Sequence, residues 1–278
     1  MTGMDNPLDP DLTPFDRLRA IMARLRDKER GCPWDVAQDF RSIVPHTIEE
    51  AYEVADAIEQ GDMPGLVGEL GDLLFQVAFY SQMAEEAGLF DFADVLKALN
   101  GKMIERHPHV FGSTEIGSAA AQTVAWEQKK AEERAQRAAE TGATASALDG
   151  VIQALPAMTR AEKLQKRAAR VGFDWPEAGQ VLDKIVEELG EVRQEIAAKG
   201  APERLGDEIG DLLFACVNLA RHLEVDPEGA LRQANRKFER RFRRVEALAA
   251  ATGRPMETIP LEKLEEFWQI AKAEERAG

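Results

Sequence analysis

The sequence predicts an all-α fold built from two tandem helical-bundle repeats. Charged residues make up 31% of the 278 residues and aromatic residues only 6%, and the abundant Ala, Leu, Glu and Arg favour helices over strands. No segment alternates apolar and polar residues convincingly, as a half-buried strand does. The segments GELGDLLFQV at 68–77 and GDEIGDLLFACV at 206–217 share the sequence GDLLF. This similarity and others around it indicate a duplicated helical unit.

The composition along the chain divides it into four segments. Residues 1–13 are acidic and rich in proline, and we expect a disordered tail. The N-terminal repeat is predicted over 14–137 and the C-terminal repeat over 153–278. Between them, residues 138–152 include a run of small and polar side chains followed by glycine, which is typical of a linker.

Charge and cysteine content exclude several protein classes. The 50 acidic and 35 basic residues give a net charge of −15, which argues against a broad nucleic-acid-binding surface. The N-terminus lacks the features of a signal peptide, and no run approaches the ~18 apolar residues of a membrane span. We therefore expect a cytoplasmic protein with no membrane partner. Cys32 and Cys216 are expected to be reduced, with Cys216 as a small core residue.

In the first repeat, a helix is predicted to start at Thr13-Pro14, where a good N-cap precedes proline. Gly31–Trp34 interrupts it, and Trp34 is either a core residue or a wall against which a base stacks. The next helix is predicted over 46–60, with Thr47 as N-cap and Glu50 at the spacing of a capping box. Further helices are predicted over 66–87, 91–106 and 119–141.

The second repeat follows the same order. A helix around Met158–Arg167 is followed by Val171–Pro176, which resembles the break at Gly31–Trp34. Helices are then predicted over 178–198 and 203–223. Later positions also correspond: Asn235 and Arg241 to Asn100 and Arg106, and Trp268 to Trp126. The motif His107-Pro108-His109 has no counterpart in the second repeat, so we interpret it as a helix stop rather than a metal site.

Paired carboxylates are the strongest functional signal. Each repeat contains EExxE and, on the next helix, ExxD, and carboxylates three residues apart share one face of a helix. These faces border apolar stripes, where an unpaired charge costs several kcal/mol. A divalent cation removes this cost, and hard oxygen ligands suit Mg²⁺, with Mn²⁺ as a substitute. The alternative is that these residues form the solvated faces of acidic helices. The predicted metal ligands are Glu50, Glu53, Glu69 and Asp72 in the first repeat and Glu188, Glu191, Glu208 and Asp211 in the second.

Such a metal site indicates polyphosphate chemistry, in which the cation neutralises phosphate oxygens and activates water. A further carboxylate, Glu187 or Glu191, is the candidate to accept the proton of the water. Lys184 lies one helical turn before Glu188, and Lys237 and Arg241 lie one turn apart on a locally basic helix. We therefore expect these cations to bind phosphate. The sequence contains no GxxxxGK[ST] loop, so the protein is not a P-loop NTPase.

The carboxylate motif followed by GDLLF resembles the MazG family of nucleoside triphosphate pyrophosphohydrolases. Other segments that are similar to this family are GCPWD at 31–35, ERHPHVFG at 105–112, VGFDW at 171–175 and NRKFERRF at 235–242. The resemblance covers about residues 15–130 and 155–276, and implies the all-alpha NTP pyrophosphohydrolase fold.

The resemblance also implies the reaction NTP + H₂O → NMP + PPi, with tolerance of ribo-, deoxyribo- and non-canonical nucleotides, a housecleaning role and a homodimer. The predicted catalytic residues are Glu187, Glu188, Glu191, Glu208 and Asp211. The predicted substrate-binding residues are Lys184, Asn235, Lys237, Arg241 and Trp268.

The two repeats are not equivalent, because His46 stands at the position of Lys184. We therefore predict that the C-terminal repeat carries most of the activity. The main alternative is a non-catalytic helical module that senses Mg²⁺ and nucleotide. A di-iron bundle is disfavoured, because no histidine follows these glutamates at a spacing of three.

Overall fold

The computed structural model describes residues 7–113 and 146–277, together with 117–118, 121–122, 124, 128–129, 131–132 and 140. This part of the chain consists of helices and loops and contains no β-strand, so the all-α prediction is confirmed. The chain divides into two compact units, Met1–Thr123 and Val124–Gly278. Most of the predicted helix over 119–141, including Trp126, lies outside the described residues. Residues 1–6 of the predicted tail and residues 138–139 and 141–145 of the predicted linker also lie outside the described residues.

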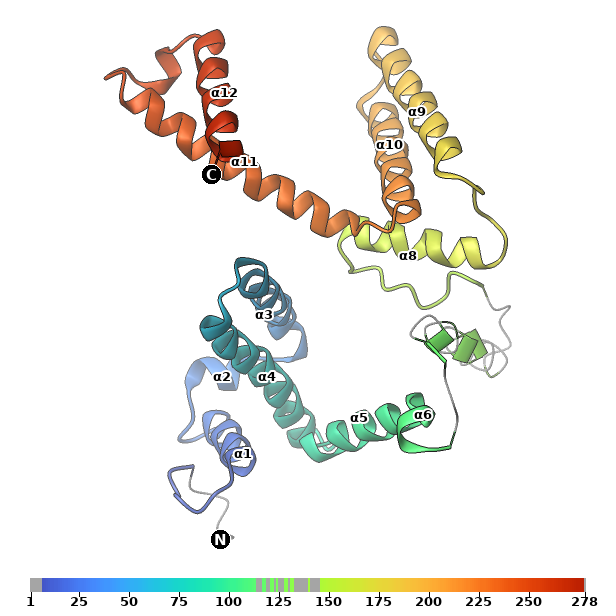
Figure 1. Ribbon diagram of the computed structural model, residues 1–278. Helices are drawn as coiled ribbons and strands as arrows, with labels where there is room; N and C mark the ends of the chain where they lie inside the picture. Colours follow the sequence, from blue (N-terminus) through green and yellow to red (C-terminus); the bar gives the residue numbers. More distant parts are fainter. Residues whose placement is uncertain are drawn as a thin grey trace. The chain divides into compact units, whose positions relative to one another are not determined.

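The N-terminal unit is organised around an antiparallel pair of long helices, α3 and α4, which lie side by side (Figure 1). Helices α1 and α5 pack against α4. The helices of this unit are α1 (Pro14–Leu25), α2 (Pro33–Ala37), α3 (Phe40–Gln60), α4 (Met63–Glu86), α5 (Phe92–Arg106) and α6 (Pro108–Phe111). The predictions for α1, α4 and α5 are confirmed to within a few residues. His107 ends α5, as predicted, and its Nδ1 lies 2.7 Å from the carbonyl oxygen of Met103.

A buried cluster holds this unit together. Met22 of α1 and Ile43 of α3 pack with Phe79 of α4 and Phe92 of α5. Burying side chains of this size stabilises a fold by about 1.5–3 kcal/mol each. The cluster therefore fixes which faces of α3 and α4 are turned inward.

The predicted start of α3 is wrong. The helix begins at Phe40, and Asp39 caps it by accepting hydrogen bonds from the backbone of Arg41 and Ser42. Thr47 lies inside the helix, where its hydroxyl bonds the carbonyl oxygen of Ile43. Pro45 stands within the helix without ending it, although a proline at this depth removes one backbone hydrogen bond.

The C-terminal unit repeats the antiparallel pair as α9 and α10 and adds a second hairpin of α11 and α12 (Figure 1). Helix α8 packs against α10 and α11. The elements are α8 (Ala157–Arg170), α9 (Ala178–Ala198), α10 (Pro202–His222), α11 (Pro227–Ala250), the 3-10 turn η1 (Met256–Thr258) and α12 (Leu261–Ala277). The predicted bounds of α9 and α10 agree to within one residue.

Cys216 is exposed on α10, so its prediction as a core residue is wrong. Its neighbours Ala215 and Val217 are buried. The run LLFACV places apolar side chains on more than one side of the helix, and periodicity alone does not separate the covered side from the open side. Both cysteines are free thiols. Within the described residues, no helix combines the length and apolar character needed to cross a bilayer.

Candidate functional site

The hairpin of α9 and α10 brings three predicted metal ligands together. Glu188 and Glu191 of α9 and Glu208 of α10 each place a carboxylate oxygen within 4.8 Å of the others. We call these residues the C-terminal carboxylate cluster. They meet because the helices run antiparallel after a short turn, in which Lys199 adopts a left-handed conformation with φ of 50°.

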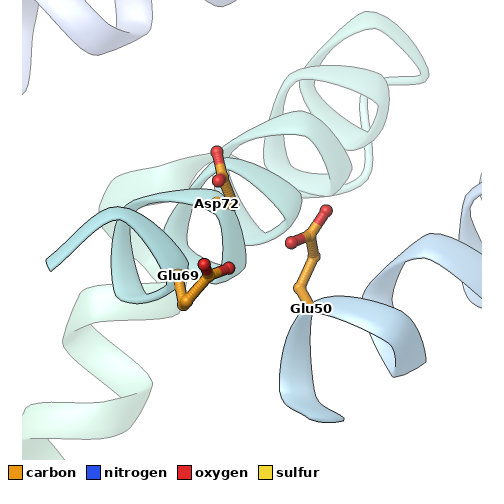
Figure 2. Close-up of side chains that lie close together, drawn as sticks. All are labelled: Glu50, Glu69 and Asp72. Atoms are coloured by element: carbon orange, nitrogen blue, oxygen red, sulfur yellow. The ribbon is translucent and has the colours of Figure 1, made fainter. Parts of the chain in front are cut away.

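The hairpin of α3 and α4 forms a group of the same kind, which includes Asp72 but not Glu53, the counterpart of Glu191. Glu50 of α3 and Glu69 and Asp72 of α4 satisfy the same distance limit, and Figure 2 shows these three side chains close together. We call these residues the N-terminal carboxylate cluster. Gly61, with φ of 73°, makes the turn between the helices, and this conformation costs glycine least.

Glu188 is the most constrained carboxylate of its cluster. It is only 5% exposed, and its Oε1 lies 2.8 Å from Nζ of Lys184. Its Oε2 is buried and has no hydrogen-bond partner among the described residues. A buried carboxylate oxygen without a partner is costly, and a hard cation is the ligand that would satisfy it best. The donor set of this cluster therefore fits Mg²⁺ or Mn²⁺.

Lys184 joins two glutamates of α9. Its Nζ lies 2.7 Å from Oε1 of Glu187 as well as 2.8 Å from Glu188. The hydrogen bonds to Glu187 and then Glu188 raise the pKa of Lys184 above its ordinary value. The lysine is therefore a permanent positive charge beside the cluster, as expected for a phosphate-binding group.

Crowding of negative charge is visible in the pKa values of both clusters. A hydrogen bond with Glu188, followed by burial, raises the pKa of Glu191. Burial, followed by the charges of Glu53 and Asp72, raises the pKa of both Glu50 and Glu69. Like charges at this distance favour protonation of one partner unless a cation is present.

The N-terminal cluster has a different residue at the position of Lys184. His46 lies there, with Nδ1 3.7 Å from Glu49 and its ring edge-on to Trp34 at 5.9 Å. Trp34 is 52% exposed, so its interpretation as a core residue is wrong. The other interpretation, in which Trp34 is a wall against which a base stacks, stays a prediction.

The C-terminal cluster borders a cavity of about 260 Å³. Glu188, Asp211 and Lys184 line one part of it, and Trp175 and Asn218 line another. The sequence reasoning missed Asn218. A signal was present, because Asn218 is a polar residue in an apolar run, seven positions after Asp211 and thus on the same face of α10.

The remaining predicted substrate-binding residues lie on the second hairpin of this unit. Helix α11 begins near α8 and the end of α10 and extends away from the α9–α10 hairpin (Figure 1). Arg241 forms an ion pair with Glu275 at 2.6 Å and stands over the ring of Trp268 at 5.8 Å. Lys237 lines a separate hollow of about 360 Å³, and Asn235 is exposed nearby on α11. In the described part of the chain, none of these four residues lines the cavity beside Glu188.

Comparison with known proteins gives a consistent result. The model of the MazG nucleotide pyrophosphohydrolase domain matches residues 38–111 and 178–245. A nucleoside triphosphate pyrophosphohydrolase of Escherichia coli is 52% identical over 265 residues, which cover 95% of this chain and 99% of that protein. The nucleoside triphosphate pyrophosphohydrolase/pyrophosphatase MazG of Thermotoga maritima is 43% identical over 93% of this chain and 95% of its own length. The uncharacterized protein YabN of Bacillus subtilis is 39% identical over 94% of this chain, which matches 52% of YabN.

Proposed function

The chain belongs to the MazG family and is a nucleoside triphosphate pyrophosphohydrolase, and we propose that it acts with Mg²⁺ held by the carboxylates of α9 and α10. The observation that carries the proposal is the C-terminal carboxylate cluster, in which Glu188 has a buried oxygen without a partner among the described residues. Asp211 lines the adjoining cavity and is the candidate fourth ligand. Mn²⁺, which accepts similar oxygen ligands, is expected to substitute.

Bound Mg²⁺ would neutralise negative charge on the phosphate oxygens and favour a nucleophilic water. Lys184 is placed to donate a hydrogen bond to a phosphate oxygen from the rim of the cluster. Glu191 has a raised pKa, and Glu187 is exposed beside Lys184, so either can accept the proton released when water attacks.

We propose that the attack occurs at the α-phosphorus. The water oxygen forms a bond to this phosphorus, the bond to the bridging α–β oxygen breaks, and pyrophosphate leaves while the carboxylate takes the proton. The choice of this bond follows from the activity named for the relatives. We expect both ribo- and deoxyribonucleotides, including non-canonical ones, to be substrates.

We propose that the C-terminal repeat carries most of the activity. Lys184 supplies a cation beside Glu188, whereas His46 stands at the equivalent place and contacts Glu49. An imidazole binds phosphate more weakly than a lysine ammonium does. The N-terminal cluster is then a metal site with lower affinity for a triphosphate.

We propose that the protein forms a homodimer through its long hairpins. Helix α9 leaves an apolar stripe exposed at spacings of four, three and seven residues, and α10 leaves another that includes Cys216. Two helices with one open apolar face each are half of a four-helix bundle, and a second copy offers the same surface in return. The stripes consist of Leu182, Val186, Leu189 and Ile196 on α9 and Ile209, Leu213 and Cys216 on α10.

The test is incubation of the purified protein with Mg²⁺ and a panel of ribo-, deoxyribo- and damaged nucleoside triphosphates, with pyrophosphate and orthophosphate quantified separately. We expect equal amounts of pyrophosphate and nucleoside monophosphate, lost on addition of EDTA. Orthophosphate with nucleoside diphosphate would contradict the proposed bond, and turnover in EDTA would contradict the role of the cation.

A further inference from the structure

The two repeats differ in what fills the space beside their carboxylates. The shared GDLLF segments align 71–75 with 210–214. In this register Ala215 stands where the first repeat has Gln76, and Asn218 stands where it has Phe79. Each C-terminal residue is smaller than its N-terminal counterpart.

In the N-terminal unit, bulky side chains occupy this place. Phe79 is completely buried in the core cluster with Ile43. Gln76 is also buried and directs its Nε2 toward Glu50 at 3.4 Å. The volume next to the N-terminal carboxylate cluster is thus taken up by the protein itself.

In the C-terminal unit, the corresponding place is the cavity of about 260 Å³. Ala215 and Asn218 form its floor on α10, and Trp175 forms a wall from the loop before α9. Ligand pockets typically have volumes of ~300–1,000 Å³, so this cavity has room for one ring system but not for a whole nucleotide. Because Glu188 and Asp211 also line it, a ligand seated here would extend toward the metal site.

The amide of Asn218 is held in one orientation. It is 5% exposed, and its Oδ1 accepts a hydrogen bond from Nη2 of Arg221 at 2.7 Å. Arginine is only a donor, so the oxygen must face Arg221. Asp174, the neighbour of Trp175 in the sequence, in turn accepts from Arg221 Nη1 at 2.9 Å.

The Nδ2 end of the amide is consequently the end available to a ligand. It has no hydrogen-bond partner among the residues that the structure describes. A fixed donor without a partner in the lining of an open cavity can bind a ligand that brings an acceptor.

We propose that this cavity receives the nucleobase of the triphosphate, with Trp175 against the face of the base and Asn218 Nδ2 donating to an acceptor on its edge. The proposal rests on the proposed function and adds the base-binding residues to it. Each common base carries a ring nitrogen or a carbonyl oxygen that accepts a hydrogen bond. A single donor together with an aromatic wall therefore binds bases broadly and discriminates against ligands without a base.

The test places the glutamine of the N-terminal repeat at the corresponding position of the cavity. Ala215→Gln should raise KM for ATP and CTP by about 10-fold or more, since it fills the space of the base, with a smaller change in kcat. Inorganic triphosphate has no base, so its Ki as a competitive inhibitor should stay within about twofold. Ala198→Gln, which adds the same side chain at an exposed position of α9, is the matched control and should behave as the unsubstituted protein does.

A second variant isolates the donor. Asn218→Asp keeps the shape of the side chain and an acceptor for Arg221 but removes the Nδ2 donor, and should raise KM for ATP while leaving Ki for inorganic triphosphate unchanged. The proposal would be overturned if KM for ATP were unchanged in both variants. It would also be overturned if Ki for inorganic triphosphate rose by the same factor as KM for ATP. If the unsubstituted protein releases no pyrophosphate, the proposed function fails by itself. Calorimetric titration of the same variants with ATP and with inorganic triphosphate then tests separately whether the cavity binds the base.

Discussion

Lys184 Nζ lies 2.8 Å from Oε1 of Glu188, one helical turn away on α9. This ion pair satisfies one oxygen of a carboxylate whose other oxygen is buried and has no partner in the described part of the chain. One oxygen of Glu188 therefore holds the lysine, and the other is left to bind a cation. In the N-terminal unit, His46 does not make the equivalent contact and pairs with Glu49 instead.

The first prediction concerns this lysine. Lys184→Met should lower kcat/KM by about 10- to 100-fold, because a charge-assisted hydrogen bond to phosphate contributes roughly 1.5–3 kcal/mol. The matched control is His46→Met, which should leave kcat/KM within about twofold. The measurement is steady-state release of pyrophosphate at saturating Mg²⁺. Equal effects of the two substitutions would contradict the assigned difference between the repeats.

The second prediction concerns the carboxylates. Glu188→Gln combined with Glu191→Gln should reduce turnover by more than about 100-fold, because the amides cannot supply the charge that holds the cation. The matching double substitution at Glu50 and Glu53 should retain most of the turnover. Circular dichroism confirms that each variant remains helical. Loss of activity in the N-terminal variant alone would reverse the assignment of the active repeat.

The sequence predicts most of the helical framework, because helix periodicity and caps are local properties. The bounds of α9 and α10 follow from the apolar stripe and from Pro202 near the start of α10. The start of α3 does not follow, because Thr47 and Glu50 have the spacing of a capping box although Asp39 caps the helix earlier, with Pro45 inside it. A proline disfavours a helix locally, but the packing of Ile43 in the core outweighs that cost.

The grouping of the carboxylates follows in large part from spacing, since pairs three residues apart share a helix face and the antiparallel helices bring two such faces together. Glu53 and Asp211 nevertheless lie outside the two groups. The cavity does not follow, because it depends on what is missing: Ala215 in place of Gln76, and Asn218 in place of Phe79. An empty space beside a helix leaves no periodic pattern in the sequence. The exposure of Cys216 has the same origin, since an apolar residue on a helix does not reveal which neighbour, if any, covers it.

The third prediction concerns pH and metal. The pKa of Glu191 is raised, first by its hydrogen bond with Glu188, so the folded protein without metal binds a proton there that the unfolded chain releases above about pH 4.3. The contribution of Glu191 to stability therefore falls as pH rises through this window to the raised pKa. The raised pKa values of Glu50 and Glu69 act in the same direction.

Mg²⁺ should reverse this loss of stability with rising pH, because the bound cation takes the place of the proton on the carboxylates. Calorimetric titration with Mg²⁺ in buffers of different ionisation enthalpy should detect proton release near the raised pKa, and the apparent affinity should rise with pH until the carboxylates are fully ionised. Glu191→Gln has no titrating group at this position and serves as the control. The prediction fails if proton release is the same in this variant as in the unsubstituted protein.

The fourth prediction concerns the proposed homodimer. Val186 is 70% exposed at the centre of the open stripe of α9, so a charge there should not disturb the fold of one chain but should be buried without a partner in a dimer. Sedimentation should give twice the 30.8 kDa of one chain for the unsubstituted protein, and mostly monomer for Val186→Glu. Val171→Glu, at a similarly exposed valine at the end of α8, is the control and should remain dimeric. If the unsubstituted protein sediments as a monomer at micromolar concentration, the proposed homodimer is contradicted. A dimer that persists in Val186→Glu would instead place the contact between copies away from α9.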